Sequence, residues 1–270
     1  MTKFGYVWLA CGLLALVAGC ADRDDGKRAD GSAPDAASGK GGKDAGGKTP
    51  AKGGATDGGE IPNAGASATW PMMGYDERNG YFNPNETTLS VKNTGKLVEK
   101  WRFTTAGFPP GTPVVGDGMV FVMATMGTYA IDLETGKEVW KRLDLIGSAS
   151  MAFEPGFVYA HDGTAHLWKL NAASGKTVWG PVLTNEQVGC DGTSSPILGG
   201  GSVIVGRSCG VVEVGSAPNG FQGGVVAVDV DAGEISWEYV TVTEPEDGAM
   251  VWSSVGIDVK GGVVYASTGN

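Results

Sequence analysis

The sequence predicts an all-β protein of the propeller class, built from repeated units of about 40 residues. Trp101, Trp140 and Trp179 are spaced 39 residues apart, and Trp237 follows 58 residues after Trp179. A tight-turn triplet that contains glycine precedes each of the last three tryptophans: Thr-Gly-Lys, Ser-Gly-Lys and Ala-Gly-Glu. A fixed period of this length, with several short strands in each unit, is typical of the blades of a β-propeller.

Each unit is a series of short apolar runs, rich in Val, Ile and aromatic residues and bounded by Gly, Asp and Asn, which is the pattern of β-strands. The predicted strands, with the turn that precedes the last one of each unit, are 113–115, 118–122, 129–132 and 135–140, then 156–159, 167–171 and 174–179, then 196–198, 202–205, 225–229 and 233–237. A fourth unit begins at Ser253 and includes a strand over 262–266. The third unit has 19 extra residues between Val205 and Val225. They predict a long loop, which in a compact fold is usually functional or without fixed structure.

The turn before each periodic tryptophan has residues suited to a hairpin. In the first unit, Asp132 can accept hydrogen bonds from its own turn, and Gly136 supplies a positive φ without the clash of a Cβ. The tryptophan that follows is large enough to bridge neighbouring blades. We therefore expect the four periodic tryptophans to have structural packing roles.

The first 19 residues have the pattern of an export signal. Lys3 precedes an apolar stretch over 7–18 that is too short to span a membrane stably. Val-Ala-Gly before Cys20 resembles a bacterial lipobox, which implies that Cys20 becomes the lipidated first residue of the mature protein. Ala21 rather than aspartate follows, and by resemblance to known sorting rules this favours the outer membrane. We expect an exported lipoprotein, anchored in the outer membrane on the periplasmic or cell-surface side; an ordinary secretory signal with a chance cysteine is the alternative.

Residues 20–69 are predicted to form a flexible tether. From Ala21 to Thr69 there is no aromatic residue, and Ile61 is the only large aliphatic one, so little apolar surface offsets the entropy of ordering the chain. Residues 70–270 are predicted to form part of a propeller and suffice for one core. The formal net charge of −10, without a basic stripe, argues against nucleic-acid binding.

Two cysteines remain once the export signal and its terminal cysteine are set aside, namely Cys190 and Cys209. In an exported protein a disulfide between them is the favoured arrangement, and a metal role would need further ligands nearby. His161 and His166 flank an Asp-Gly-Thr turn and have no partner at metal-ligand or catalytic-triad spacing. We therefore expect both histidines on a surface loop.

The segment from Trp70 to Trp101 has a distinctive pattern. It contains Trp-Pro-Met-Met-Gly-Tyr-Asp from residue 70, Asn-Pro-Asn-Glu-Thr-Thr-Leu from residue 83 and Asn-Thr-Gly-Lys-Leu from residue 93. Together with residues 221–229 and 251–270, this segment resembles the quinoprotein alcohol dehydrogenases, in particular their polyvinyl-alcohol dehydrogenase-like branch. The resemblance covers residues 70–270. It implies an eight-bladed propeller of PQQ-type repeats that binds pyrroloquinoline quinone (PQQ), with about half of the blades in this chain.

The resemblance also implies a cofactor site. Trp252 lies 18 residues before Asn270, as in the quinoprotein pattern, where the tryptophan is the floor under the planar quinone and the asparagine is a ligand of Ca²⁺. Glu213, the only acidic residue in the long third-unit loop, is the second implied calcium ligand. Arg207 is a candidate partner for a PQQ carboxylate. The structural alternatives are a packing tryptophan, a turn asparagine, a solvated acid and a surface arginine.

No catalytic residue is assigned within this chain, because the resemblance places the catalytic aspartate beyond Asn270. We therefore expect a fragment of a longer protein or a truncated product. The leading hypothesis is PQQ-dependent oxidation of an alcohol by a lipid-anchored dehydrogenase. The sequence has no Cys-x-x-Cys-His motif for c-type haem, so electrons would pass to a separate acceptor such as a c-type cytochrome. The alternatives are a non-catalytic propeller scaffold similar to the outer-membrane protein assembly lipoprotein, and a cell-surface binding module on a flexible stalk.

Overall fold

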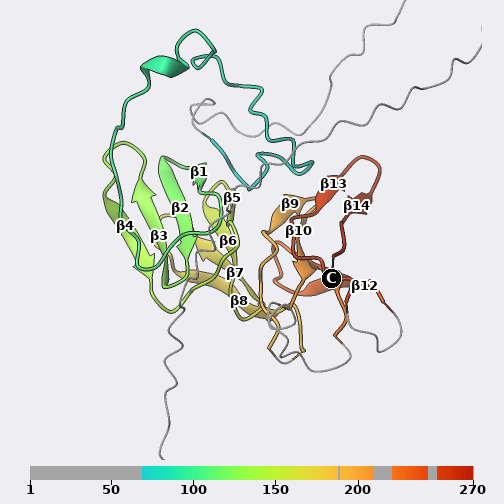
Figure 1. Ribbon diagram of the computed structural model, residues 1–270. Helices are drawn as coiled ribbons and strands as arrows, with labels where there is room; N and C mark the ends of the chain where they lie inside the picture. Colours follow the sequence, from blue (N-terminus) through green and yellow to red (C-terminus); the bar gives the residue numbers. More distant parts are fainter. Residues whose placement is uncertain (1–68, 188, 210–220, 243–247, 270) are drawn as a thin grey trace, which may run out of the picture. The chain divides into compact units, whose positions relative to one another are not determined.

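Residues 69–187, 189–209, 221–242 and 248–269 are described in the computed structural model. Within these ranges the chain forms three four-stranded sheets and one two-stranded sheet, with a single 3-10 turn at Thr94–Lys96 (Figure 1). No helix in this part of the chain is long and apolar enough to cross a membrane. The predicted all-β class is therefore confirmed.

The strands of each sheet follow chain order and pair antiparallel, so each sheet is a meander of the kind that forms a propeller blade. The first sheet contains β1 (Val114–Gly116), β2 (Met119–Ala124), β3 (Gly127–Asp132) and β4 (Glu138–Arg142). The second contains β5 (Ala152–Glu154), β6 (Phe157–His161), β7 (His166–Asn171) and β8 (Thr177–Leu183). The third contains β9 (Ile197–Gly199), β10 (Ser202–Arg207), β11 (Gly224–Asp229) and β12 (Ile235–Val240). The two-stranded sheet contains β13 (Gly256–Asp258) and β14 (Val263–Tyr265).

The two middle strands of the first and third sheets are buried along almost their whole length, as expected for strands covered on both faces by neighbouring sheets. One core cluster joins Phe121 of β2 to Val158 of β6, and another joins Val226 of β11 to Tyr159 of β6 and Ile257 of β13. The sheets therefore stack face to face. The inner strand β5 was not predicted, because Ala-Phe-Glu lacks the β-branched residues that marked the other strands.

Three of the four periodic tryptophans each dock on the last turn of a sheet that follows them in the chain. The Trp140 indole is 8% exposed, and its Nε1–H donates to the Ala172 carbonyl at 2.7 Å. Gly175 in the same turn has a φ of +67°, and a Cβ there would lie 2.7 Å from the indole. Glycine is therefore required both by the left-handed backbone and by the close approach of the ring. The same arrangement joins Trp101 to Leu133 and Gly136, and Trp179 to Val230 and Gly233.

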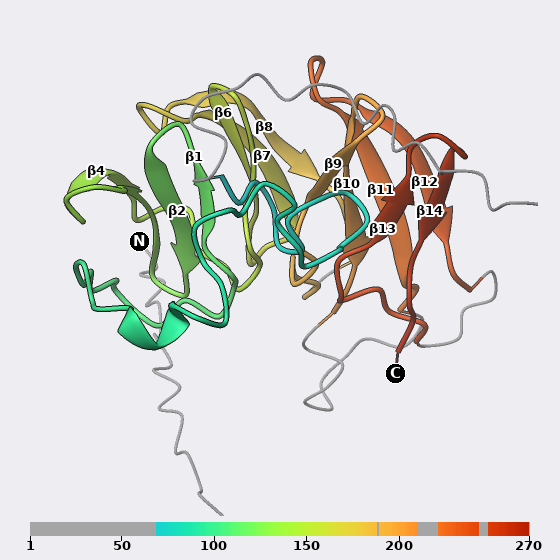
Figure 2. The ribbon, with the colours of Figure 1, turned by 90° about the horizontal axis from the view of Figure 1, so that it is seen from above.

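The segment that opens the described chain crosses the inner strands of the sheets. Trp70 pairs with the backbone of β1, and the Phe153 amide of β5 donates to the Pro71 carbonyl at 2.6 Å. Further along, the Ile257 amide of β13 donates to the Glu77 carbonyl at 2.6 Å. Figure 2 shows the segment passing from β1 towards β13. One short stretch of chain is thus hydrogen-bonded to the first, second and fourth sheets.

Candidate functional site

Trp252 lies in the connection between β12 and β13, and 53% of its surface is exposed. The backbone on either side of it is held: Met250 pairs with Gly269, and the Val251 amide donates to the Arg207 carbonyl at 3.0 Å. A Cβ at Gly269 would lie 3.0 Å from the indole Nε1, so glycine leaves this edge of the ring uncrowded. An exposed indole on a fixed backbone presents a flat apolar face that suits a planar ligand.

Arg207 ends β10, and its backbone adjoins the Trp252 segment, but its side chain has other partners. The Arg207 Nε–H donates to the Thr184 carbonyl at 2.9 Å, and the guanidinium forms an ion pair with the Glu238 carboxylate. The side chain of Arg207 is 15% exposed. The guanidinium therefore connects the end of β8 to the outer strand β12. The sequence hypothesis had instead paired it with a carboxylate of PQQ.

Three residues of the predicted site, Cys20, Glu213 and Asn270, lie outside the described residues. Gly269, the residue before Asn270, is hydrogen-bonded to Met250, so the described chain ends beside the Trp252 segment. Across the described ranges, no group of three or more His, Cys, Asp or Glu side chains is arranged to hold a metal ion. Calcium binding by Glu213 and Asn270 stays a prediction.

Cys190 and Cys209 are joined in a disulfide across a sequence separation of 19 residues. Cys190 lies in the connection before β9, and Cys209 follows β10. Both cysteines pack with Phe221 and Met250 in a small buried cluster, and the Cys209 amide lies 3.3 Å from the Met250 Sδ. Because Met250 lies two residues before Trp252, the disulfide supports the start of the Trp252 segment.

Buried hydroxyl groups connect the same segment to the third sheet. The Ser194 Oγ accepts a hydrogen bond from the Gly206 amide at 2.9 Å and donates one to the Ser253 carbonyl at 3.0 Å. The Ser253 hydroxyl lies 2.9 Å from the Ser267 hydroxyl. Sequence reasoning missed Ser194. The only local signal was the hydroxyl-rich Thr-Ser-Ser before the predicted strand 196–198, and its partners are distant in sequence.

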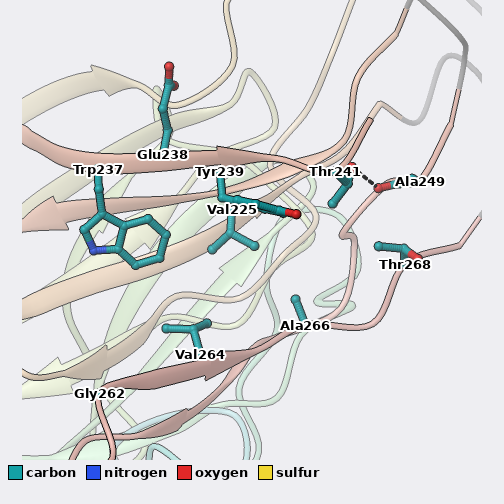
Figure 3. A pocket seen from close by; sticks show the side chains of 10 residues that line it. All are labelled: Val225, Trp237, Glu238, Tyr239, Thr241, Ala249, Gly262, Val264, Ala266 and Thr268. Carbon is teal, nitrogen blue, oxygen red and sulfur yellow. Dashed lines mark hydrogen bonds between the residues drawn. The ribbon is translucent and has the colours of Figure 1, made fainter. Parts of the chain in front are cut away.

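A pocket of about 670 Å³ lies between the third sheet and β14 (Figure 3). Figure 3 shows Trp237 of β12 across this space from Val264 of β14. Trp237 is 40% exposed, and among the described residues it has no turn carbonyl of the kind that holds the other periodic tryptophans. The pocket therefore lies where the third sheet and the two-stranded sheet face each other. Trp252 does not line it, so this pocket and the candidate cofactor site are separate.

His161 departs from expectation, because its side chain at the end of β6 is fully buried rather than on a surface loop. Its Nδ1 lies 2.9 Å from the Ser194 carbonyl, which can only accept, so Nδ1 carries the proton. Its Nε2 lies 2.9 Å from the Thr184 hydroxyl. Burial lowers the pKa of His161, so the imidazole is held neutral. His161 therefore has a structural role with both ring nitrogens occupied.

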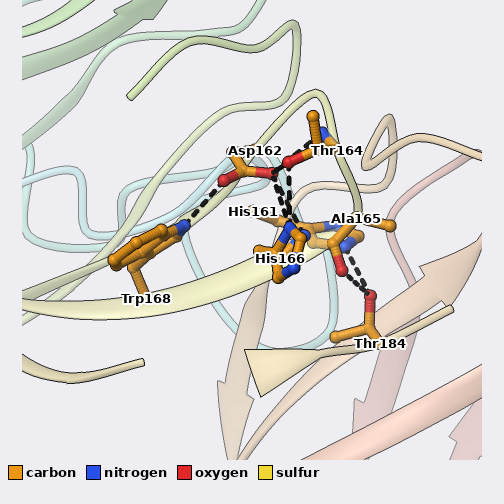
Figure 4. Close-up of polar contacts among 7 residues, drawn as sticks. All are labelled: His161, Asp162, Thr164, Ala165, His166, Trp168 and Thr184. Carbon is orange, nitrogen blue, oxygen red and sulfur yellow. Dashed lines mark hydrogen bonds and ion pairs between the residues drawn. The ribbon is translucent and has the colours of Figure 1, made fainter. Parts of the chain in front are cut away.

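The neighbouring turn is organised by Asp162, as Figure 4 shows. Its carboxylate accepts hydrogen bonds from the Thr164 amide at 2.8 Å, the Thr164 hydroxyl at 2.7 Å and the Trp168 indole at 2.7 Å. The His166 amide adds a fourth bond at 3.1 Å. The His166 side chain is partly exposed, but the residue begins strand β7 and does not lie on the expected surface loop. Both carboxylate oxygens of Asp162 thus accept hydrogen bonds from the turn or from Trp168, and Asp162 closes the β6–β7 hairpin.

A family model described as outer membrane protein assembly factor BamB (PQQ_2) matches residues 86–270. Polyvinylalcohol dehydrogenase of Pseudomonas sp is 26% identical in an alignment 230 positions long, which covers 74% of this chain and 36% of the relative. Quinohemoprotein alcohol dehydrogenase of Comamonas testosteroni is 26% identical in an alignment 251 positions long, which covers 77% of this chain and 34% of the relative. The chain therefore spans about a third of the length of these relatives.

The fold is similar to that of the solved quinohemoprotein alcohol dehydrogenase from Comamonas testosteroni, with a TM-score of 0.66 and 24% identity over 77% of this chain and 36% of that one. The solved ADHIIG from Pseudomonas putida HK5 gives a TM-score of 0.65 and 22% identity over 76% of this chain and 35% of that one. These likenesses confirm the predicted PQQ-type propeller fold, and the relatives confirm the predicted resemblance to quinoprotein alcohol dehydrogenases.

Proposed function

The chain belongs to the family whose model is described as outer membrane protein assembly factor BamB, and from this premise and its alcohol dehydrogenase relatives we propose that it is part of a PQQ-dependent enzyme that oxidises an alcohol. The observation that carries the proposal is the exposed indole of Trp252, at the position where the resemblance puts the floor of the quinone site. Because the chain spans about a third of these relatives, the activity is proposed for the whole protein.

The described residues fit a planar quinone at Trp252. The indole is 53% exposed, and Gly269 leaves its Nε1 edge uncrowded, since a Cβ there would lie 3.0 Å away. Hydrogen bonds at Val251 and Ser253 fix the backbone on both sides of the ring. PQQ supplies the redox chemistry that amino-acid side chains lack. The part of this chain is to bind one face of the quinone and to set its orientation.

Calcium is proposed as the accompanying ion, held by the side-chain oxygens of Glu213 and Asn270. A carboxylate and an amide oxygen are the hard ligands that Ca²⁺ prefers, and an ion at this place would polarise a quinone carbonyl. Arg207 is a weaker candidate for cofactor contact, because a PQQ carboxylate would have to displace Glu238 from its guanidinium. We assign no proton acceptor within residues 70–270.

The remaining proposals concern location and partners. A lipid anchor at Cys20 would hold the protein at the outer membrane, on the periplasmic or cell-surface side, and residues 20–69 would act as the tether. The substrate would be an alcohol. The acceptor of electrons would be a separate protein such as a c-type cytochrome.

The deciding measurement is the melting temperature of the protein with PQQ and Ca²⁺. A ligand that binds only the folded state stabilises it by about 2.7 kcal/mol at 100 times its dissociation constant, so we expect a clear rise. The rise should disappear in Trp252→Ala and persist in the control Trp237→Ala, which removes another exposed tryptophan. An unchanged melting temperature of the wild-type protein under these conditions would refute the proposal.

A second candidate, a non-catalytic scaffold at the outer membrane, is favoured by the description of the matching family model. It needs neither the exposed indole nor a calcium ligand set. It therefore predicts no response of the melting temperature to PQQ with Ca²⁺, and equal behaviour of Trp252→Ala and Trp237→Ala. The same titration thus distinguishes the two candidates.

A further inference from the structure

Trp252 makes no hydrogen bond of its own among the described contacts, and its orientation therefore depends on the backbone that carries it. On the N-terminal side, that backbone is held by the end of β10 and by Gly269. On the C-terminal side, residues 254–257 are held by a loop nearly 180 residues earlier in the sequence, at residues 72–81. This 72–81 loop lies within the segment that crosses the inner strands (Figure 2).

Three contacts join the 72–81 loop to the Trp252 segment. The Asn79 Nδ2–H donates to the Val255 carbonyl at 2.7 Å. The Ile257 amide donates to the Glu77 carbonyl at 2.6 Å, and the Ser254 Oγ lies 3.1 Å from the Met73 Sδ. Two of these contacts come from side chains of the loop, those of Asn79 and Met73, and can be removed without changing the Trp252 segment itself; the bond from Asn79 is the shorter of the two.

The loop is built to hold the Asn79 side chain in place. Asn79 has a φ of +54°, which asparagine adopts more readily than most residues. The Asp76 carboxylate accepts hydrogen bonds from the Gly80 amide at 2.8 Å and the Arg78 amide at 3.2 Å, so the backbone around Asn79 is fixed from both sides. A Cβ at Gly74 would lie 2.5 Å from the Asn79 Cα and against its Oδ1. Glycine at 74 therefore lets the loop close over the amide.

The burial of Asn79 and Met72 also indicates that the 72–81 loop supports the Trp252 segment. The Asn79 Oδ1 is buried and has no hydrogen-bond partner among the described residues, which is a free-energy cost that a purely local loop would avoid with a smaller residue. Met72, at the start of the loop, is 7% exposed and packs in the core cluster that contains Val251 and Val255. The loop is thus part of the core beneath the Trp252 segment.

We propose that Asn79 is a positioning residue for Trp252: its amide, carried on the 72–81 loop, holds the segment that presents the indole to the cofactor. The inference rests on the proposed function in so far as it names PQQ as the molecule that meets the indole. A held segment does not lose conformational freedom on binding, so the affinity for a stacked ligand is higher than that of a loose one.

The test uses the full chain in four forms. Asn79→Asp keeps the shape but faces the Val255 carbonyl with a carboxylate, and Asn79→Gly keeps the positive φ but removes the donor. Gly74→Ala keeps the Asn79 side chain but displaces it, because the new Cβ would clash with Asn79. Asn85→Asp is the control, because Asn85 is exposed and, among the described residues, its side chain makes one hydrogen bond, to the Tyr75 hydroxyl at 3.3 Å.

Three measurements are made on each variant below its melting temperature. Hydrogen exchange of a peptide covering residues 250–258 in the ligand-free protein should be about tenfold faster in Asn79→Asp and unchanged in Asn85→Asp. The dissociation constant of PQQ with Ca²⁺ should rise about tenfold in Asn79→Asp and somewhat less in Asn79→Gly and Gly74→Ala. The induced circular dichroism of the quinone at saturating PQQ should also change, which a loss of overall stability would not produce.

The outcomes separate the inference from the proposed function. If Trp252→Ala weakens PQQ binding while the Asn79 variants keep wild-type exchange and affinity, the positioning role is wrong and the function stands. If exchange becomes faster but PQQ affinity is unchanged, positioning for the cofactor is likewise overturned. If the wild-type protein binds no PQQ, the proposed function fails first, and the inference fails with it.

Discussion

Replacing Gly175 by alanine tests why the docking turns contain glycine. Gly175 has a φ of +67°, and a Cβ at this position would lie 2.7 Å from the Trp140 indole. Gly118 has nearly the same backbone, with a φ of +71°, but a Cβ there would meet nothing within 4 Å. Gly118→Ala therefore measures the backbone term alone, and Gly175→Ala measures the backbone term together with the displaced tryptophan.

The two substitutions should differ by about 2–4 kcal/mol in the free energy of unfolding. A non-glycine residue in the left-handed region costs about 1–2 kcal/mol, partly offset by the lower entropy of the unfolded chain, so Gly118→Ala should cost about 1 kcal/mol. In Gly175→Ala, crowding of the indole adds about 1–3 kcal/mol, and weakening of the bond from Trp140 to Ala172 adds about 1 kcal/mol.

Urea unfolding followed by tryptophan fluorescence gives both free energies, with circular dichroism as the second probe. Gly118→Ala and Gly175→Ala should have the same slope against urea as the wild-type protein and different midpoints. Equal destabilisation by the two substitutions would refute the reasoning, because it would mean that the contact with the indole contributes nothing beyond backbone strain.

Three further predictions follow from the same structure. Trp140→Phe should cost about 1–2 kcal/mol by leaving the Ala172 carbonyl without its donor, as urea unfolding would show. Replacing Cys190 and Cys209 by serine should cost about 3 kcal/mol, since their disulfide closes a loop of 19 residues, and a reducing agent should lower the wild-type melting temperature to that of the double variant. Because burial lowers the pKa of His161, the unfolded chain takes up a proton at higher pH than the folded one; stability should fall as the pH drops below about 6.5, and this slope should be smaller in His161→Asn.

Much of the fold could be predicted because the repeat depends on local chemistry. The turn before Trp140 needs an acceptor and a glycine, and both stand at fixed offsets in the sequence. Strands with β-branched residues on both faces, such as β10 and β11, were recognisable for the same reason. The inner strand β5 was missed because pairing with β6, rather than its own composition, makes it a strand.

The candidate site was predictable only where a residue type and a spacing were enough. Trp252 was chosen from its spacing to Asn270, and the structure adds that its indole is exposed. The pairing of Arg207 with Glu238 could not be read from the sequence, because the two side chains meet across a neighbouring strand. The burial of His161 was missed for a similar reason, since its partners Ser194 and Thr184 come from the connection to the next sheet.

The sequence by itself determined the blade repeat and the resemblance to quinoproteins, because a turn, a strand and a docking tryptophan are each specified within one unit of the chain. The tertiary structure alone decided how the Trp252 segment is held. The bond from Asn79 to Val255 joins residues 176 positions apart, and no local pattern records it. The physical reason is that short-range propensities fix the elements, whereas hydrogen bonds between distant loops exist only once the sheets have packed.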